Sequence, residues 1–441
     1  MKPGRRCLIV APVFPPSGLP PAHRARLFAR HLPSFGWEPV VLTVDPRDRE
    51  EVPEPALTAT VPSHIQIEYA RALPAMLARV AGIGDVAIRA LPSLALRAVS
   101  VARRADASVV LLVVPPWYGL LLAPWLERRL GIPVVVDYLD PWDVGGDVGG
   151  AGGFKRSLAA WVAARAEGPC LRQVAGVFAV SDGIVDQLRV RFPFLDGRPA
   201  GAAPYGFEPA DLALVAPHTA AGASVPIPAT NGRPLPIRIV YVGAISQSQR
   251  VVMCALLDAI TRLRRRSPDA AARIRVECYG TGYARPGQAT TRVADLAAER
   301  GLKAWVTESP GRVPYAEALA MMATSGANLV LGDLTTYYSA SKLMPVLASG
   351  RPVLAVLHSE TEPARLLRRL HATGLVCYGN ATAPTPGDAV LSIADKLECL
   401  ALGRVAPIAA DADAREVLKM RTAEHMTKEL ARVLDNVVAA A

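Results

Sequence analysis

The sequence lacks the cysteine patterns of metal sites and disulfide frameworks. Its 441 residues include six cysteines that lie far apart along the chain, namely Cys7, Cys170, Cys254, Cys278, Cys377 and Cys399. The absence of a CxxC pair or a Cys/His cluster argues against a zinc site. Most of these cysteines stand in apolar stretches, so we expect buried thiols of a protein that works in a reducing compartment.

The sequence also lacks an unbroken apolar run long enough to cross a bilayer. The longest candidate, VVLLVVPPWYGLLLAPWL, is divided by Pro115 and Pro116 into a strand and the start of a helix, and each part is too short to span. The opening MKPGRRCLIV leads directly into a predicted strand and shows no signal peptide. These features favour a cytoplasmic protein.

Clustered basic residues are scarce, although the formal net charge is +10 and the pI is near 9.5. The densest run, RLRRR at 262–266, falls on a predicted helix, where a solvated face explains it. We therefore do not expect nucleic-acid binding. Arg24, Arg26 and Arg30 leave open a loose peripheral contact with the anionic inner face of a membrane, but a solvated helix face explains them as well.

The chain does contain a regular alternation of apolar strands and amphipathic helices. Continuous apolar strands separated by helices predict parallel sheets covered on both faces, hence an α/β protein with two Rossmann-like lobes facing a cleft. A Pro-, Ala- and Gly-rich stretch divides the two series. We predict a first domain at 1–206, a linker at 207–236, a second domain at 237–418, and a C-terminal helix at 419–441 that returns to the first domain.

Candidate site residues in the first half follow predicted strands. Gly18 lies in a loop before a helix that bears Arg24, a suitable place for an anion, although an ordinary strand-to-helix turn explains it too. The stretch LDPWDVGG places Asp140, Trp142 and Asp143 after another strand. Carboxylates suit sugar hydroxyls, an indole suits the C–H face of a sugar ring, and Asp140 could accept a proton from an acceptor hydroxyl. Structural capping by Asp140 remains an alternative.

Four loops of the second half also follow predicted strands and contain residues suited to a nucleoside diphosphate. No GxGxxG fingerprint is present. A helix start near Ser341 and Lys342 would offer hydroxyls, free N–H groups and an ammonium, as a diphosphate requires, although a capped helix with a solvated lysine explains it as well. The full set of donor-side candidates is Gly243, Ser246, Arg250, Gly280, Arg312, Val313, Ser341 and Lys342.

The order of these motifs resembles that of GT-B glycosyltransferases, specifically glycosyltransferase family 4, over nearly the whole chain. VDYLDPW resembles a D-x-x-D-P-W segment, GVFAVSDGIVDQL and PYGFEP resemble ADAVFAVSEG and IPNGFD, and IVYVGAIS resembles lvYvGrls. SKLMPVLASGRPVLA resembles KLFEYLASGKPVLA. The resemblance implies retaining transfer of a sugar from a nucleotide diphosphate sugar to a glycan, lipid-linked or small-molecule acceptor, in bacterial glycan or glycoconjugate biosynthesis.

The resemblance also implies positions for individual residues. Gly18 would approach the donor phosphates, Asp140 would lie near the reacting sugar, and Lys342 would lie by the nucleotide-binding helix. Donor would bind the second lobe, and acceptor mainly the first. Asp140, Asp143 and Asp147 could hold a metal, but nothing else in the sequence supports one, so we predict no metal and no cofactor.

Two departures from the family pattern concern nucleotide recognition. The glutamate that would hold the ribose is replaced by Pro345, and Tyr337 stands where an E-x7-E pattern has its first glutamate. The arginine that follows the glycine in YvGrls is Ala244, so Arg250 is a candidate substitute. Some bacterial members have SKxxPxxxxxRPLLAxxH-like segments, in which the equivalents of His358 and Glu360 could contact sugar or phosphate.

The sequence leaves two other functions open. A sugar-nucleotide epimerase or hydrolase of the same architecture would act on the donor alone. A non-catalytic pseudo-glycosyltransferase would bind a partner or glycan, and the missing glutamate motivates that reading.

Overall fold

The computed structural model describes residues 5–80, 83–142, 154–215, 236–282, 289–408 and 412–441. The chain divides into two compact units. The first lobe comprises Met1–Glu208 and Arg421–Ala441, and the second lobe comprises Pro209–Met420. The predicted bounds of 206 and 419 lie within two residues of these divisions, and most of the predicted linker, residues 216–235, lies outside the described residues.

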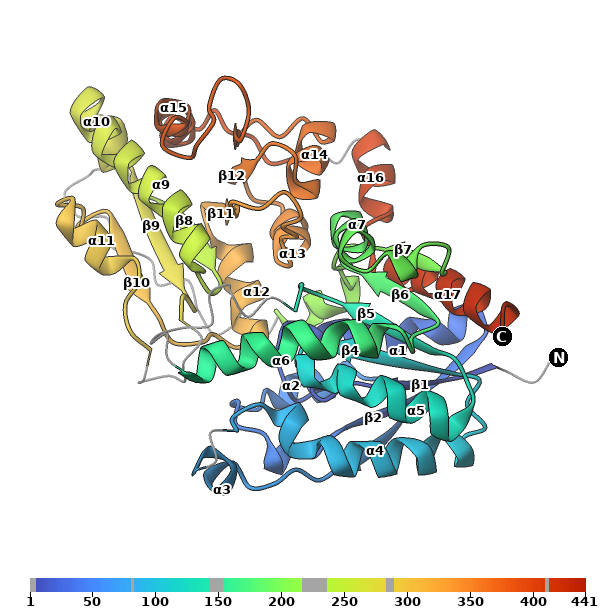
Figure 1. Cartoon of the computed structure of the whole chain (residues 1–441). Helices are drawn as coiled ribbons and strands as arrows, with labels where there is room; N and C mark the ends of the chain where they lie inside the picture. Colours follow the sequence, from blue (N-terminus) through green and yellow to red (C-terminus); the bar gives the residue numbers. More distant parts are fainter. Residues whose placement is uncertain (1–4, 81–82, 143–153, 216–235, 283–288, 409–411) are drawn as a thin grey trace. The chain divides into compact units, whose positions relative to one another are not determined.

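The first lobe is built on a parallel sheet with the strand order β3-β2-β1-β4-β5-β6-β7 (Figure 1). Its strands are β1 (Arg5–Val10), β2 (Trp37–Val44), β3 (Gln66–Ala70), β4 (Val109–Val114), β5 (Val134–Tyr138), β6 (Gly176–Ala179) and β7 (Ala200–Ala202). Its helices are α1 (Pro20–His31), α2 (Pro55–Thr58), α3 (Ala75–Val80), α4 (Val86–Arg104), α5 (Ala123–Leu130), α6 (Phe154–Leu171), α7 (Asp182–Arg191) and α17 (Ala423–Ala439). Short 3-10 turns are η1 (Leu32–Phe35), η2 (Pro46–Asp48), η3 (Trp117–Leu122) and η4 (Pro193–Leu195).

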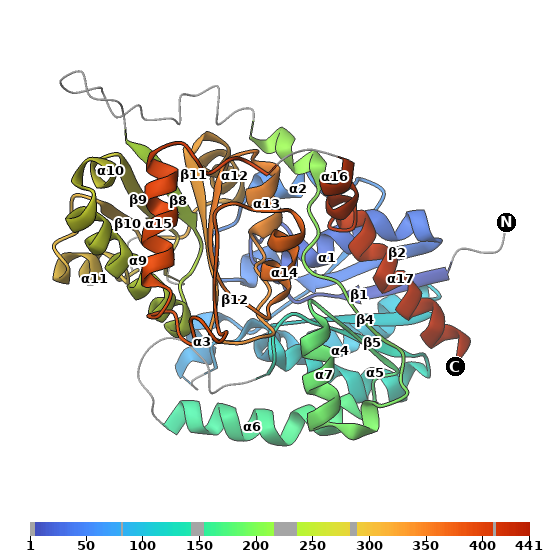
Figure 2. The ribbon, with the colours of Figure 1, turned by 90° about the horizontal axis from the view of Figure 1, so that it is seen from above.

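The second lobe repeats this plan with the parallel order β10-β9-β8-β11-β12-β13 (Figure 2). Its strands are β8 (Ile237–Val242), β9 (Ile274–Tyr279), β10 (Val306–Ser309), β11 (Ala327–Leu331), β12 (Val353–His358) and β13 (Leu375–Tyr378). Around them lie η5 (Pro209–Leu214), α9 (Gln247–Arg266), α10 (Pro268–Ala272), α11 (Ala294–Glu299), α12 (Tyr315–Thr324), α13 (Leu343–Ala348), α14 (Glu362–Arg369), α15 (Val390–Ala401) and α16 (Ala412–Lys419).

Both sheets have the doubly wound arrangement that the sequence predicts. The central strands β4 and β5 are buried along their whole length, and β1 is buried from Cys7 to Val10, because helices cover both faces of the sheet. In each lobe the order of strands reverses next to the first strand, beside β1 in one and β8 in the other. In open α/β sheets, ligands bind beyond the carboxyl ends of the strands at such a reversal. Gly18 follows β1 and Gly243 follows β8, so both stand at these positions.

The last helix of the chain begins at Ala423, a few residues after the predicted start at 419. The C-terminal segment forms two helices, α16 in the second lobe and α17 in the first, separated at 420–422. The break lets the chain cross back, and Thr422 caps α17 by accepting a hydrogen bond from the backbone N–H of His425. At the crossing, Phe207 N–H donates to the Arg421 carbonyl oxygen at 2.9 Å, and Ala423 N–H donates to the Phe207 carbonyl oxygen at 2.9 Å.

No helix in the described ranges is both long and apolar enough to cross a membrane. The stretch that most resembled a span is split, as expected, into β4, η3 and α5. The predicted start of a helix after Pro116 forms the 3-10 turn η3, and the α-helical part α5 follows it.

Candidate functional site

In the second lobe, loops from four strand ends meet around Gly243. Gly243 has φ +147° and Gly280 has φ +66°, conformations that favour glycine. A side chain at Gly280 would contact the backbone N–H of Val313 and Gly243, with gaps of 3.7 and 3.9 Å from its Cβ. A side chain at Gly243 would instead collide with the Lys342 ammonium. The structure therefore brings together Gly243, Gly280, Val313 and Lys342, which lie up to 99 residues apart in the sequence.

Lys342 stands in this group as a cation in crowded surroundings. Its side chain keeps access to solvent, yet protein atoms surround the ammonium closely. Burial, and secondarily the positive charge of Arg312, lower its pKa from 10.5 to about 8. Two cations held near each other form a site for an anion, because an anion relieves their mutual repulsion.

The helix predicted to begin at Ser341 and Lys342 is short and begins one residue later. α13 covers Leu343–Ala348, and Lys342 is its N-terminal flanking residue without a side-chain cap. Pro345 is therefore the third residue of the helix, within the first turn, where backbone N–H groups have no intrahelical acceptor. Its carbonyl oxygen accepts a hydrogen bond from Ser349 N–H at 3.0 Å. The proline thus fits α13 without loss of a helical hydrogen bond.

A carboxylate that the sequence analysis did not single out lies beside Ser246. Ser246 caps α9 through a reciprocal pair of hydrogen bonds with Gln249. Asp333, two residues after β11, accepts hydrogen bonds from the hydroxyls of Ser248 at 2.6 Å and Ser246 at 3.3 Å. The Ser246 side chain thus already has hydrogen-bond partners within the second lobe. Arg250, one turn into α9, is exposed. The sequence did contain a signal for Asp333, namely an acidic residue two positions after a buried strand.

His358 and Glu360 follow β12 at the same edge. The His358 ring meets Tyr378 edge-on with a centroid distance of 5.7 Å, and its Nδ1 accepts a hydrogen bond from Glu360 N–H at 3.3 Å. Tyr378 in turn donates to the Asp333 carbonyl oxygen at 2.7 Å. His358 is therefore half-buried and connected to the loop after β11, whereas the Glu360 side chain is exposed.

Glu308 is a second acid that sequence reasoning missed, and its role is structural. Its carboxylate accepts hydrogen bonds from the Thr281 hydroxyl and from the backbone N–H groups of Arg292, Val293 and Ala294. It thereby satisfies the N–H groups at the start of α11. This fixes the loop after β9 that contains Gly280 against the end of β10.

In the first lobe, Asp140 lies two residues beyond β5 with an exposed side chain. Its charge is near Tyr205, whose pKa is raised first by burial and then by the Asp140 carboxylate. Tyr205 is therefore a neutral phenol at physiological pH. Asp143 and Asp147, which were considered with Asp140, lie outside the described residues. Among the residues that the structure describes, no three His, Cys, Asp or Glu side chains gather as metal ligands would.

Arg24, a candidate for sugar or acceptor contact by its place in the sequence, has a fully buried side chain in the structure. Its Nε donates to both Asp137 carboxylate oxygens at 3.0 and 2.8 Å, and its terminal nitrogens donate to the carbonyl oxygens of Ala203 and Ala179 and contact Met426 Sδ. The guanidinium also lies near the rings of Phe28, Phe178 and Tyr205. Burial raises the pKa of Asp137, and the charge of Arg24 opposes that rise.

Burial of Arg24 also argues against the membrane contact that the sequence left open for Arg24, Arg26 and Arg30. Arg26 is buried as well, and its guanidinium lies 3.4 Å from His23 Nδ1. Arg30 is partly exposed but lies 3.4 Å from Glu208, which also pairs with His31. These arginines face the interior of the lobe because α1 packs against α17 and the sheet.

The predicted stacking of Trp142 on a sugar is also wrong. Only 3 % of the side chain is exposed. Its ring stacks on Trp117 with a centroid distance of 6.3 Å and an interplanar angle of 11°, and Tyr118 meets it edge-on at 5.5 Å. Both aromatic neighbours come from η3, so the indole completes the core beneath the loop after β5.

Gly18 is buried beside a carboxylate. A side chain at Gly18 would collide with the Glu54 carboxylate, and Glu54 N–H donates to the Pro16 carbonyl oxygen at 2.7 Å. A phosphate and this carboxylate repel each other at such a distance. The contact between Gly18 and donor phosphates stays a prediction, and it requires the Glu54 side chain to rotate away.

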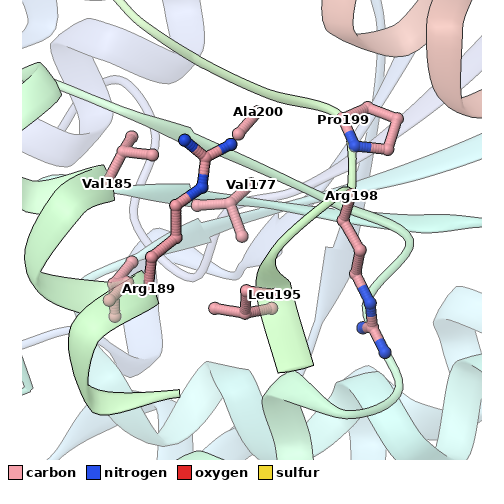
Figure 3. Close-up of a pocket in the computed structure, with 8 residues that line it drawn as sticks. Val177, Val185, Arg189, Leu195, Arg198, Pro199 and Ala200 are labelled. Carbon is pink, nitrogen blue, oxygen red and sulfur yellow. The ribbon is translucent and has the colours of Figure 1, made fainter. Parts of the chain in front are cut away.

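A small pocket in the first lobe lies among β6, β7, α7 and η4 (Figure 3). Its internal space is about 10 Å³, roughly enough for one water molecule, and Arg189 extends across it toward Ala200. Arg198 is held by the carbonyl oxygens of Leu171, Val174 and Arg172. A nucleotide needs a larger pocket, typically about 300–1,000 Å³. None of the predicted site residues lines this one, so it is a packing defect beneath α7 rather than the site.

Comparison with known proteins agrees with this architecture. Residues 21–199 match the model of the glycosyl transferase 4-like domain. Sucrose-phosphate synthase from Thermosynechococcus elongatus superposes with a TM-score of 0.63 at 15 % sequence identity. A UDP-forming α,α-trehalose-phosphate synthase from Burkholderia vietnamiensis superposes with a TM-score of 0.62 at 14 % identity. Each superposition covers 99 % of this chain and 100 % of the other. The chain has the GT-B fold. The match to the glycosyl transferase 4-like domain lies within the first lobe.

A further GT-B structure is that of Anabaena HepE in complex with UDP, with a TM-score of 0.53 at 14 % identity over 98 % of this chain and 99 % of that one. No curated protein matches the sequence. At these identities the structural relatives establish the GT-B fold, and the matched domain lies in the lobe that contains Asp140.

Proposed function

We propose that this GT-B protein is a retaining glycosyltransferase that moves a sugar from a nucleoside diphosphate sugar to an acceptor hydroxyl. The observation that carries the proposal is the group of Gly243, Gly280 and Lys342 beside Arg312 at the strand reversal of the second lobe. Glycines there let a ligand approach the backbone closely, and cations balance a diphosphate.

The chemistry places a growing negative charge on the leaving diphosphate. Lys342, Arg312 and the backbone N–H of Val313 would stabilise that charge as the glycosidic bond to the donor breaks. The acceptor hydroxyl must lose a proton, and Asp140 is an exposed carboxylate at the carboxyl edge of the first sheet that could take it. The chain's own side chains thus supply both roles, and we propose no metal or cofactor.

UDP is the nucleotide to test first, since the HepE structure contains UDP and the trehalose-phosphate synthase is UDP-forming. Asp333 with Ser246 and Ser248 is our candidate for the ribose-binding group in place of Pro345. Its carboxylate already accepts hydroxyl donors at the same edge of the sheet.

Calorimetric titration with UDP, GDP and ADP tests the proposal. We expect one nucleotide to bind, and Lys342→Ala to weaken it by about 10- to 100-fold, as for loss of a charge-assisted hydrogen bond. Lys303→Ala, an exposed lysine just before the amino end of β10, is the matched control and should leave the affinity unchanged. If no nucleoside diphosphate binds, or both variants behave alike, the transferase proposal fails.

Turnover of the donor separates the transferase from the alternative enzyme. A transferase releases nucleoside diphosphate mainly when an acceptor is added, whereas a sugar-nucleotide hydrolase or epimerase converts the donor alone. Asp140→Asn should abolish acceptor-dependent release while leaving nucleotide affinity intact. Binding without any turnover would instead identify a non-catalytic binding protein.

A further inference from the structure

A short helix of the first lobe exposes an apolar face. Four residues spaced as i, i+3, i+4 and i+7 lie in or just before α3, and they are exposed by 59, 80, 67 and 90 %: Leu73, Met76, Leu77 and Val80. This spacing places Met76, Leu77 and Val80 on one side of α3, with Leu73 just before the helix. An apolar side of a helix normally faces a protein core. Here only Ala78, from the opposite side, is buried. A cluster of this kind on a protein surface marks an interaction site.

The base of this helix is held firmly. Buried Arg89 donates to the carbonyl oxygens of Leu73 at 2.6 Å and Asp48 at 3.0 Å. The Asp48 carboxylate accepts a hydrogen bond from Ala72 N–H at 2.9 Å. These hydrogen bonds fix the backbone just before α3, so the exposed side chains stand on an anchored segment.

In three ion pairs beside the apolar face, the arginine is the more exposed partner. In the pairs Arg47–Asp45, Arg71–Asp48 and Arg79–Glu50, the arginine side chains are 77, 68 and 64 % exposed, and the carboxylates only 11, 11 and 27 %. Arg47 and Arg71 also lower the pKa of Asp45 and Asp48, so these carboxylates stay ionised and hold their partners. The outermost groups around α3 are thus guanidinium groups, which complement an anionic surface.

The location of α3 suits contact with a flat surface. It follows β3, the edge strand, beyond the carboxyl end of the sheet (Figure 1). Since all strands of this sheet are parallel, the same edge carries the loop of Asp140 after β5.

We propose that the side chains of Leu73, Met76, Leu77 and Val80 insert into an anionic lipid surface, with Arg47, Arg71 and Arg79 facing the headgroups. Apolar side chains on one face of a helix with arginines around them have the composition of an interfacial anchor. The inference does not depend on transferase activity. One consequence rests on the proposed function. The sheet edge that carries Asp140 would then face lipid-linked acceptors.

Sedimentation with lipid vesicles tests this anchor. Full-length protein should bind vesicles of phosphatidylcholine containing about one quarter phosphatidylglycerol, and bind pure phosphatidylcholine more weakly. Leu77→Ser/Val80→Ser should reduce the partition coefficient by at least about 10-fold, since two apolar side chains no longer leave water. Val190→Ser/Leu391→Ser removes two exposed apolar side chains elsewhere and should have no effect.

Arg71→Gln/Arg79→Gln should abolish the preference for the anionic vesicles while keeping the weaker binding. Absence of vesicle binding, equal binding to both lipid mixtures, or equal loss in the control variant would each overturn the proposal. So would self-association in the absence of lipid that Leu77→Ser/Val80→Ser removes, because the face would then bind a second copy of the chain. Unchanged UDP affinity in the double variants separates this outcome from failure of the proposed function.

Discussion

The two sheet edges of this protein use charged residues in opposite ways. At the edge of the second sheet, Lys342 and Arg312 lie near each other beside Gly243, and burial and mutual repulsion lower the pKa of Lys342. In the first lobe, Arg24 meets Asp137 and three further partners inside the fold. A buried arginine paired with a buried carboxylate holds a fold together, whereas cations placed side by side are arranged for a ligand.

We expect the largest effect from removing Arg24. Arg24→Ala leaves the buried Asp137 carboxylate without its counter-charge and the carbonyl oxygens of Ala179 and Ala203 without their donor. We expect the first lobe to lose about 3–5 kcal/mol of stability. Denaturant unfolding, with hydrogen exchange measured separately for peptides of each lobe, would locate the loss.

Arg30→Ala is the matched control, since Arg30 also lies on α1 but is partly exposed and pairs with Glu208 at 3.4 Å. Its loss should cost at most about 1 kcal/mol. Arg24→Lys should not restore stability, because one ammonium cannot replace the planar fork that reaches four partners. If Arg24→Ala unfolded no more readily than Arg30→Ala but abolished acceptor use, Arg24 would belong to the site after all.

In the second lobe, we expect a change of pH to have an effect of intermediate size through Lys342. Lys342 has a pKa of about 8 in the folded protein against 10.5 ordinarily, so the unfolded chain binds more protons between these values. The stability of the protein without ligand should therefore rise with pH from about 8 to 10.5 through this group. Nucleotide affinity should fall over the same range, since only the ammonium attracts a diphosphate.

Calorimetry at several pH values, in buffers of different ionisation enthalpy, would detect the proton taken up on binding above pH 8. Lys342→Ala should remove the uptake, and Lys303→Ala should keep it. An affinity that stays constant from pH 7 to pH 10 would show that Lys342 does not meet the diphosphate.

Much of the fold was predictable because the periodicity of buried strands and amphipathic helices is local. The alternation gave both sheets and the return of α17, and the fold comparisons confirm the GT-B architecture. The second-lobe group was predictable for a related reason. Glycines and polar residues that directly follow parallel strands must meet at one edge of a sheet, whatever their separation in sequence.

The first-lobe errors have a physical cause as well. Sequence spacing placed Arg24 on an amphipathic helix but could not show which side faced the core. The available signal was Asp137, a carboxylate inside the continuous apolar strand VVVDY, since a buried acid requires a buried cation. Trp142 was misread because the stretch after β5 gave no indication that Trp117 and Tyr118 would cover the indole.

The smallest expected effect concerns Pro345, which stands where the family pattern has a glutamate. As the third residue of α13, the proline removes no helical hydrogen bond and restricts the unfolded chain. Pro345→Ala should therefore lower stability by about 1 kcal/mol or less and leave nucleotide affinity unchanged, as thermal unfolding and calorimetry can measure. Pro345→Glu, which restores the family's acid, should strengthen UDP binding only if the ribose passes over α13. If the affinity stays constant and Asp333→Asn weakens it, the ribose instead lies against the loop after β11.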